Sequence, residues 1–165
     1  MATSTSAKLP VPPRTRYEDD LYTWVEEQVE LLRAGRLSEI DALNLAEELS
    51  DVGNAQLDKL ESSIALLTQH ILKWEHQPER RTVSWQASVS EQRRRIVRVL
   101  KKNPGLKSKL VEALQEGYAD GRDRAVAETT LPYAHFPEQC PYTFDEMMTR
   151  PIVYEPKPAS RRKKR

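Results

Sequence analysis

The stretch that decides the fold is 57-LDKLESSIALLTQHILKWEHQPERRTVSW-85. Its apolar residues recur at steps of three and four, at Leu57, Leu60, Ile64, Leu67, Ile71 and Trp74. Residues at this spacing lie on one face of an α-helix and form a continuous apolar stripe. The stretch therefore predicts a long helix over about 54–76, which Pro78 closes because the residue before a proline disfavours helical angles.

Two further helices are predicted before this stretch. The first runs from about residue 17 or 19 to Ala34 and stops at Gly35, with acidic residues in its first turn. The second begins at Ser38, a good N-cap residue, and Gly53 then marks a break or bend before the long helix. These elements predict that the chain enters its central helix through two shorter ones.

Two more main helices and a short one are predicted after it. Ser84 is expected to cap the fourth helix, and Asn103 with Pro104 to start a fifth that runs to about Glu128. Gly117 and Gly121 lie on one face of that fifth helix. Because glycine costs about 1 kcal/mol against alanine inside a helix, this pair predicts close contact with another helix.

The short last helix is predicted over 144–149, where Thr143 and Glu146 have the spacing of a capping box. Together these elements predict an all-α protein, a compact bundle of about five main helices plus a short C-terminal one. We expect a disordered arm over 1–16, a single helical domain over 17–149, and a disordered basic tail over 150–165.

Composition limits the classes of protein to which the chain can belong. With 165 residues, 38% of them hydrophobic, it can bury a core without disulfides or metal. A lone Cys140 excludes an intramolecular disulfide and a cysteine-rich zinc site. No apolar run has the length of a membrane-spanning helix, and the N-terminus lacks the apolar core of a signal peptide. We therefore expect a cytoplasmic protein with no membrane partner.

Charge is strongly segregated along the chain, although the net charge is only +1. Eleven Asp and Glu residues lie between Glu18 and Asp51, against Arg33 and Arg36. Residues 85–102 carry six Lys and Arg and only one acid, and the last six residues are almost wholly basic. Blocks of opposite sign can face each other within one fold or mark separate partner surfaces.

The order of several short motifs resembles a bacterial family known as domain of unknown function 29. The resemblance covers about residues 17–148 and is specific, since many separate motifs keep their order and spacing. The matching motifs are Tyr17-Glu18-Asp19-Asp20-Leu21-Tyr22-Thr23-Trp24, Leu31-Leu32-Arg33-Ala34-Gly35, Ile40-Asp41, Glu47-Glu48-Leu49, His70-Ile71-Leu72-Lys73-Trp74, Gln77-Pro78, Ser84-Trp85, Gln92-Arg93, Asn103-Pro104, Leu131-Pro132, Phe136-Pro137 and Cys140-Pro141.

The family resemblance implies a compact helical fold in a bacterial cytoplasm. It implies no activity, because none is established for the family. Two positions depart from the family pattern, since Gly105 stands where a serine is expected and His76 where an aromatic residue is expected. We therefore assign His76 no family role.

A first set of polar and aromatic residues is a candidate site because helical geometry puts several of them at the edges of inner faces. Buried polar groups must find partners or cost several kcal/mol. One interpretation is a structural network that satisfies itself. The other is a pocket in which His70 is a general acid or base and Arg93 binds an anion. The candidate cluster comprises Glu48, His70, Trp74, Gln77, Trp85, Gln92 and Arg93.

A metal or cofactor is not predicted. His70 and His76 are six residues apart and point to different faces of one helix. Glu75 and His76 are adjacent and cannot chelate one ion together from a regular helix. The sequence therefore predicts no metal site and no cofactor.

A second set of candidate residues is basic and follows the predicted fourth helix and the tail. Clustered Lys and Arg are what binding to phosphate requires, although a solvated basic face has the same sequence pattern. Trp85 and Tyr154 are the aromatic residues near these bases. The candidates are Arg94, Arg95, Arg98, Arg161, Arg162, Lys163, Lys164 and Arg165.

The absence of a catalytic motif beside this charge segregation favours a non-catalytic adaptor that binds another protein. Two alternatives stay open. One is a small-ligand-binding protein or enzyme that uses Glu48, His70 and Arg93. The other is a weak nucleic-acid binder that uses the fourth helix and the basic tail.

Overall fold

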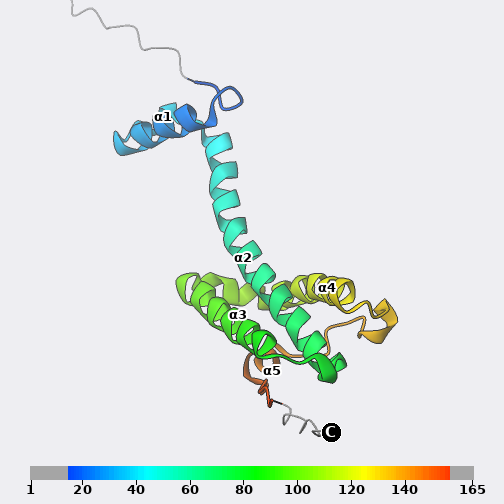
Figure 1. Ribbon diagram of the computed structural model, residues 1–165. Coiled ribbons are helices and arrows are strands. Elements are labelled where there is room, and N and C mark those ends of the chain that lie inside the picture. Colours follow the sequence, from blue (N-terminus) through cyan, green and yellow to red (C-terminus); the bar gives the residue numbers. More distant parts are fainter. Residues whose placement is uncertain (1–14, 157–165) are drawn as a thin grey trace, which may run out of the picture. The chain divides into compact units, whose positions relative to one another are not determined.

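The computed structural model describes residues 15–156 and is all-α, as predicted (Figure 1). Within these residues there are five α-helices and four short 3-10 helices, and no strand. The α-helices are α1 (Leu21–Arg33), α2 (Ala42–His76), α3 (Val83–Lys102), α4 (Leu110–Thr129) and α5 (Phe144–Thr149). The predicted disordered ends, 1–16 and 150–165, lie outside the described residues except at 15–16 and 150–156, and within the latter stretch Ile152 is buried in the core. None of the helices between residues 15 and 156 is long and apolar enough to cross a membrane.

Helix α1 begins and ends close to the predicted residues. The Asp20 carboxylate accepts a hydrogen bond of 3.1 Å from the Thr23 N–H, which satisfies one of the donors left unpaired at a helix N-terminus. Gly35 follows the helix with φ of 68°, a conformation that glycine adopts without steric cost. The predicted stop at Gly35 is therefore confirmed.

The predicted break at Gly53 is wrong, because α2 runs through it without interruption. The two helices expected on either side of Gly53 are one helix of 35 residues. A single exposed glycine costs a helix about 1 kcal/mol, which is too little to stop one whose flanking turns are intact. The start was also misplaced, since Ser38 lies in a 3-10 helix, Leu37–Glu39. Asp41 caps α2 instead, accepting from the Asn44 N–H at 3.3 Å.

Helix α3 begins one residue before the predicted cap. The N-cap is Thr82, whose hydroxyl accepts from the Trp85 N–H at 3.3 Å, and Ser84 lies inside the first turn. At the other end, the Asn103 side chain donates to the Val99 carbonyl and closes α3 rather than starting the next helix. Pro104–Lys109 is a 3-10 helix, so α4 starts later than predicted, at Leu110.

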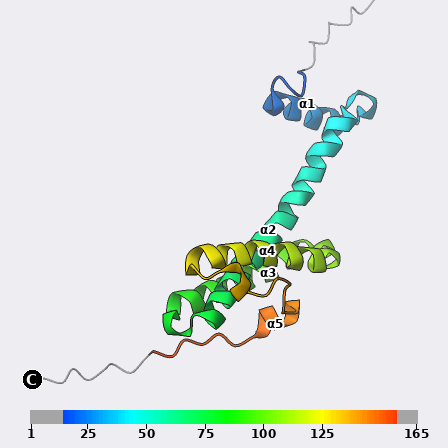
Figure 2. The same cartoon turned by 90° about the vertical axis from the view of Figure 1, so that its right-hand side faces the viewer.

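The described chain forms two units, residues 15–52 and residues 53–156, with α2 passing from the first to the second. The second unit is built on one main core cluster, to which α2, α3, α4 and α5 all contribute (Figures 1 and 2). Its buried apolar residues are Leu60, Ile64, Leu67, Ile71, Trp74, Val89, Ile96, Ala113, Met147 and Ile152. The stripe predicted from the sequence therefore forms the centre of this core.

The predicted close approach at Gly117 and Gly121 is confirmed. A Cβ atom added to Gly117 would lie 2.7 Å from a methyl carbon of Ile64, and one added to Gly121 would lie 2.5 Å from the Ala65 carbonyl oxygen. Helices α2 and α4 thus meet backbone to backbone. The short helix α5 is also as predicted, with a capping box between Thr143 and Glu146.

Candidate functional site

The first unit has a small core and much exposed apolar surface. Its only buried residues are Trp24, Gln28 and Leu31, all on one side of α1. Of the thirteen exposed large hydrophobic residues between 15 and 156, eight lie in this unit. They are Leu21, Tyr22, Val25, Leu32, Leu37, Leu43, Leu49 and Val52. The unit therefore holds most of the exposed large hydrophobic side chains of the described chain, and exposed apolar surface of this kind can mark an interaction site.

Helix α1 carries a continuous apolar stripe beside its buried side. Leu21, Val25, Val29 and Leu32 are spaced at i, i+4, i+8 and i+11, which places them on one face of the helix. Val29 is half-buried and the other three are exposed. We call these four residues the α1 stripe. Its exposed side chains leave between 36% and 46% of their surface open to solvent.

The first turns of α2 show the same property. Leu43, Leu49 and Val52 are 83%, 65% and 63% exposed. Leu45, Leu49 and Val52 lie on one side of this helix and Leu43 on nearly the opposite side. Leu45 is half-buried, whereas Leu43, Leu49 and Val52 are exposed, so apolar side chains face solvent on both sides of this part of α2.

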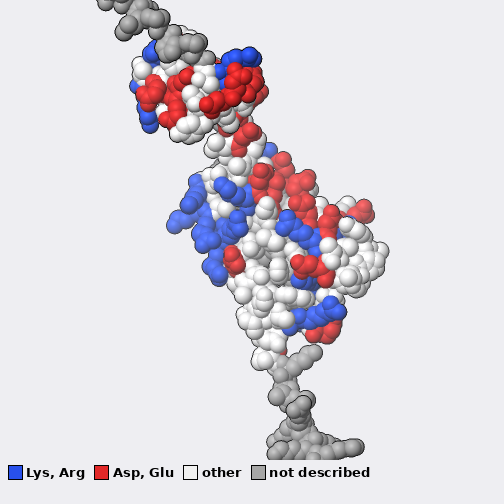
Figure 3. Space-filling view, turned by 45° about the horizontal axis from the view of Figure 1, so that its top comes forward, with Lys and Arg blue, Asp and Glu red and all other residues white. Residues whose placement is uncertain are grey.

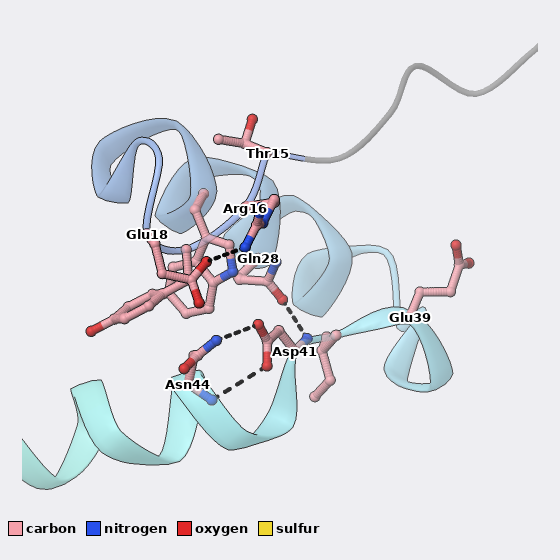
Figure 4. Close-up of a pocket in the computed structure, with 10 residues that line it drawn as sticks. Thr15, Arg16, Glu18, Gln28, Glu39, Asp41 and Asn44 are labelled. Atoms are coloured by element: carbon pink, nitrogen blue, oxygen red, sulfur yellow. Dashed lines mark hydrogen bonds and ion pairs between the residues drawn. The ribbon is translucent and has the colours of Figure 1, made fainter.

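A polar pocket of about 480 Å³ lies where α1 meets the start of α2, and the groups that line it are held by fold-stabilising bonds (Figure 4). The Gln28 side-chain oxygen accepts from the Asp41 N–H at 2.8 Å. The Asn44 side-chain amide donates to Asp41 at 2.7 Å, and this bond lowers the pKa of the Asp41 carboxyl. Figure 4 shows the Glu39 carboxylate pointing away from Asp41. The polar groups of this pocket therefore hold α1 against the start of α2. None of these bonds leaves an acid or base directed at a substrate.

Tyr17 ties the segment before α1 to α2. Its hydroxyl donates to Glu48 at 2.7 Å, and its ring packs edge-on against Trp24 with centroids 5.1 Å apart. The bond to Glu48 raises the pKa of Tyr17 to about 12. Glu48, a member of the predicted polar cluster, is thus held within the first unit by a neutral phenol.

The other members of the predicted cluster lie in the second unit. His70 is half-buried and its Nδ1 lies 2.8 Å from the Leu66 carbonyl one turn earlier. Burial is the main cause that lowers the pKa of His70. Gln77 is buried and donates to the Thr129 carbonyl. Each of these polar groups is bound to backbone, which is what a structural role requires.

Arg93 fastens the C-terminal end of α5. Its Nε donates to the Met147 carbonyl at 2.9 Å and a terminal nitrogen donates to the Arg150 carbonyl at 2.8 Å. Burial lowers the pKa of its guanidinium. Gln92 beside it is buried, and its side-chain oxygen has no hydrogen-bond partner among the described residues. The guanidinium predicted to bind an anion thus donates to two backbone carbonyls.

The two aromatic members, Trp74 and Trp85, both contact the main core. The Arg81 guanidinium lies 4.9 Å from the centre of the Trp74 ring, and its Nε donates to the Trp74 carbonyl. The Lys73 ammonium lies 4.4 Å from the centre of the Trp85 ring. Both rings therefore have a packing role and a cation beside them.

The sequence interpretation missed the most buried charge in the described chain, Lys73. It is only 7% exposed, and its ammonium donates to the carboxylate of Glu128 at the end of α4. This bond is the main cause that lowers the pKa of Glu128. A lysine inside the run Ile71-Leu72-Lys73-Trp74 was the available signal, but its partner lies 55 residues away and the spacing could not identify it.

Cys140 does not have the surroundings of a nucleophile. Its thiol donates to the Tyr142 carbonyl, and burial raises its pKa above the ordinary value. A reactive cysteine needs the opposite shift, since the thiolate is the nucleophile. Within residues 15–156, no group of three or more His, Cys, Asp or Glu side chains is arranged to hold a metal ion.

The basic candidates of α3 form one exposed surface on the second unit, where Figure 3 shows a large blue patch. Arg94, Arg95 and Arg98 are all exposed, as are Lys101 and Lys102 at the end of the helix. The tail candidates, Arg161–Arg165, lie outside the described residues.

Comparison with known proteins gives one match. The model of a family described as domain of unknown function DUF29 matches residues 16–152, which is most of the chain and includes both units. A search of curated proteins and a search of solved structures found no significant match.

Proposed function

The chain belongs to the family described as domain of unknown function DUF29, and from that premise we propose that it is a non-catalytic adaptor whose first unit binds a partner protein. The concentration of exposed apolar side chains in this unit carries the proposal. We propose that the protein acts in the bacterial cytoplasm, which the family resemblance and the single free cysteine support.

The α1 stripe supports docking of a helix. Its residues recur with helical spacing, and an amphipathic helix of a partner binds such a groove or stripe through its own i, i+4, i+7 side chains. Burial of the exposed parts of Leu21, Val25 and Leu32 would stabilise the complex, at about 25 cal/mol for each Å² removed from water.

Charge defines the chemistry of the partner. Residues 15–52 carry eleven Asp and Glu against three Arg. Glu26 is exposed beside the stripe, and Glu30 is exposed one turn later and pairs with Arg33. The matching partner is an amphipathic helix with an apolar stripe and Lys or Arg at its flanks, because complementary charges steer association and fix register.

The bonding of the polar groups supports a binding role over a catalytic one. His70, Gln77 and Arg93 bond to backbone, and Glu48 bonds to Tyr17. A general acid or base must instead be within reach of a substrate proton. The enzyme alternative stays a prediction, and turnover of a substrate that His70→Ala abolishes would establish it.

The experiment that tests the proposal uses two triple variants of the full chain. One is Leu21→Ser/Val25→Ser/Leu32→Ser on the α1 stripe. The matched control is Val83→Ser/Val97→Ser/Val111→Ser, which changes three exposed apolar residues of the second unit. Both are checked for folding by circular dichroism. Each is titrated with a synthetic amphipathic Leu/Lys helical peptide, and with a Leu/Glu peptide of the same pattern.

The proposal expects the wild type and the control to bind the Leu/Lys peptide alike, and the stripe variant to bind at least about tenfold more weakly. The Leu/Glu peptide should not bind. A native partner, captured from lysate and identified by mass spectrometry, should be lost with the stripe variant alone. Equal binding by the two variants would overturn the proposal, and so would a stripe that instead mediates dimerisation of the chain in sedimentation experiments.

A further inference from the structure

We infer that the exposed basic side of α3 binds the phosphate backbone of double-stranded nucleic acid, without reading its sequence. This site is separate from the docking surface of the first unit. It comprises Arg94, Arg95, Arg98, Lys101 and Lys102, which we call the α3 basic face.

Helical geometry gathers these five side chains. At 100° per residue, positions 94, 95, 98, 101 and 102 fall within an arc of about 120° around the helix and span about 12 Å along it. All five are exposed. Lys107, in the 3-10 helix that follows, is exposed as well. Residues 92–111 contain eight Lys and Arg and no acid, so nothing in this stretch neutralises the face.

The face also lacks ion pairs, whereas six of the thirteen other Lys and Arg between residues 15 and 156 form one. Arg33, Arg36 and Lys109 each pair with a glutamate three residues away. No residue of the α3 basic face has an ion pair or side-chain hydrogen bond among residues 15–156. The negative end of the helix dipole accounts for two lysines in the last turn. It does not account for three arginines in the middle of the helix, whose planar guanidinium groups fit phosphate oxygens.

A lipid surface is a poor match for this face. A helix that lies on a membrane inserts its apolar side among the lipids. The apolar side of α3 is already used, since Val89 and Ile96 are buried in the main core and Val99 and Leu100 pack against it. The face can therefore contact anions only through its charged side chains.

A single strand is also a poor match, which favours a duplex. Proteins that hold single strands stack bases on exposed aromatic rings. The nearest aromatic candidates from the sequence, Trp85 and Tyr154, both pack against the main core, and Lys73 lies over the Trp85 ring. The face offers charge and no stacking surface. A duplex backbone, with one charge for every ~1.7 Å of its axis, requires only charge.

The test compares two charge-matched variants of the full chain, which both keep the basic C-terminal residues. The site variant is Arg94→Gln/Arg95→Gln/Arg98→Gln. The control is Lys59→Gln/Arg80→Gln/Arg124→Gln, which removes three exposed bases without ion pairs elsewhere on the second unit. Binding to a labelled DNA duplex of about 24 base pairs is measured by fluorescence anisotropy between about 50 and 300 mM salt, and then to an RNA duplex.

We expect the site variant to bind at least about tenfold more weakly at low salt, and the slope of log K against log salt to become shallower by about 2.7, or 0.9 for each lost phosphate contact. The control should keep the wild-type slope.

Equal losses in the two variants would overturn the site, because they would assign binding to net charge or to the tail. Equal competition by poly-glutamate and by unlabelled duplex at matched charge would overturn the assignment to nucleic acid in favour of an acidic protein. DNA-only or RNA-only binding would support it and identify the duplex.

Discussion

Gly121 of α4 lies so close to Thr68 of α2 that a Cβ atom added to the glycine would be 2.5 Å from the Thr68 Cβ. The same atom would be 2.5 Å from the Ala65 carbonyl oxygen, so neither a rotamer change nor a small side-chain movement relieves the clash. The helix crossing at the centre of the second unit therefore depends on the absence of a side chain at this position.

We expect Gly121→Ala to lower the free energy of unfolding by about 1–3 kcal/mol. Overpacking a tight contact costs about this much, and it outweighs the gain of about 1 kcal/mol that alanine brings to a helix. Denaturation by urea, followed by circular dichroism, measures the difference. A variant as stable as the wild type would show that α2 and α4 can separate at no cost.

Gly53→Ala in α2 should have the opposite effect on stability to Gly121→Ala. No atom lies within 4 Å of the position that the new Cβ would take, and the residue is exposed within a continuous helix. The substitution should raise the free energy of unfolding by about 0.5–1 kcal/mol through helix propensity alone. A loss of stability would indicate that the helix needs to bend at residue 53.

These two glycines also show what the sequence could reveal. Gly117 and Gly121 share a helix face, and that periodicity correctly predicted a close contact. Gly53 has no such pattern, and its assignment as a break relied on composition alone, which an intact run of helical residues overrides. Local periodicity therefore identified the helices of the second unit and its core. The helix ends could not be predicted as well, because several neighbouring side chains could act as the N-cap.

The candidate site was harder to predict because its contacts join distant residues. Arg93 was identified from its position at the edge of an apolar stripe, but its partners are carbonyls more than fifty residues away. Lys73 and Glu128 were missed for the same reason. The exposure of the α1 stripe could not be predicted from the sequence either, because an apolar stripe has the same spacing whether it is buried or exposed in the fold.

The Lys73–Glu128 pair leads to a prediction about stability. Glu128→Gln should lower the free energy of unfolding by about 1–2 kcal/mol, because it leaves a buried ammonium without its charged acceptor while partial exposure of Glu128 screens the loss. Asp123→Asn, an exposed acid on the same helix, is the matched control and should change little. Equal effects of the two substitutions in urea denaturation would contradict the pair's role.

The pH dependence of that pair has a defined sign. The pKa of Glu128 is lower in the folded protein than its ordinary value, so its contribution is complete above about pH 4.3 and is lost as the pH falls through the folded pKa. Urea denaturation of the wild type below this pH should show a loss of stability. Glu128→Gln should show a smaller loss over the same range, and Asp123→Asn a loss like that of the wild type.

His70 leads to a prediction in a higher pH range. Burial lowers its pKa, Lys73 adds to this effect, and the Leu66 carbonyl and Glu128 oppose it. The unfolded chain therefore binds a proton more readily than the folded one. The His70 contribution is complete above its unfolded pKa of about 6.5 and is lost as the pH falls below it. The pKa of His76 is also lowered, mainly by burial, so the two histidines act in the same direction.

We therefore expect the wild type to lose stability between about pH 7 and pH 5, above the range in which Glu128 titrates. The stability of His70→Gln should decline less steeply, because the variant lacks one of the two histidines whose protonation favours unfolding. The stability of His70→Gln/His76→Gln should be nearly constant over this range. Urea denaturation at several pH values measures all three. If the free energy of unfolding of the double variant declined as steeply as that of the wild type, groups other than the two histidines would cause the decline. The lowered pKa values of His70 and His76 would then have no effect on stability.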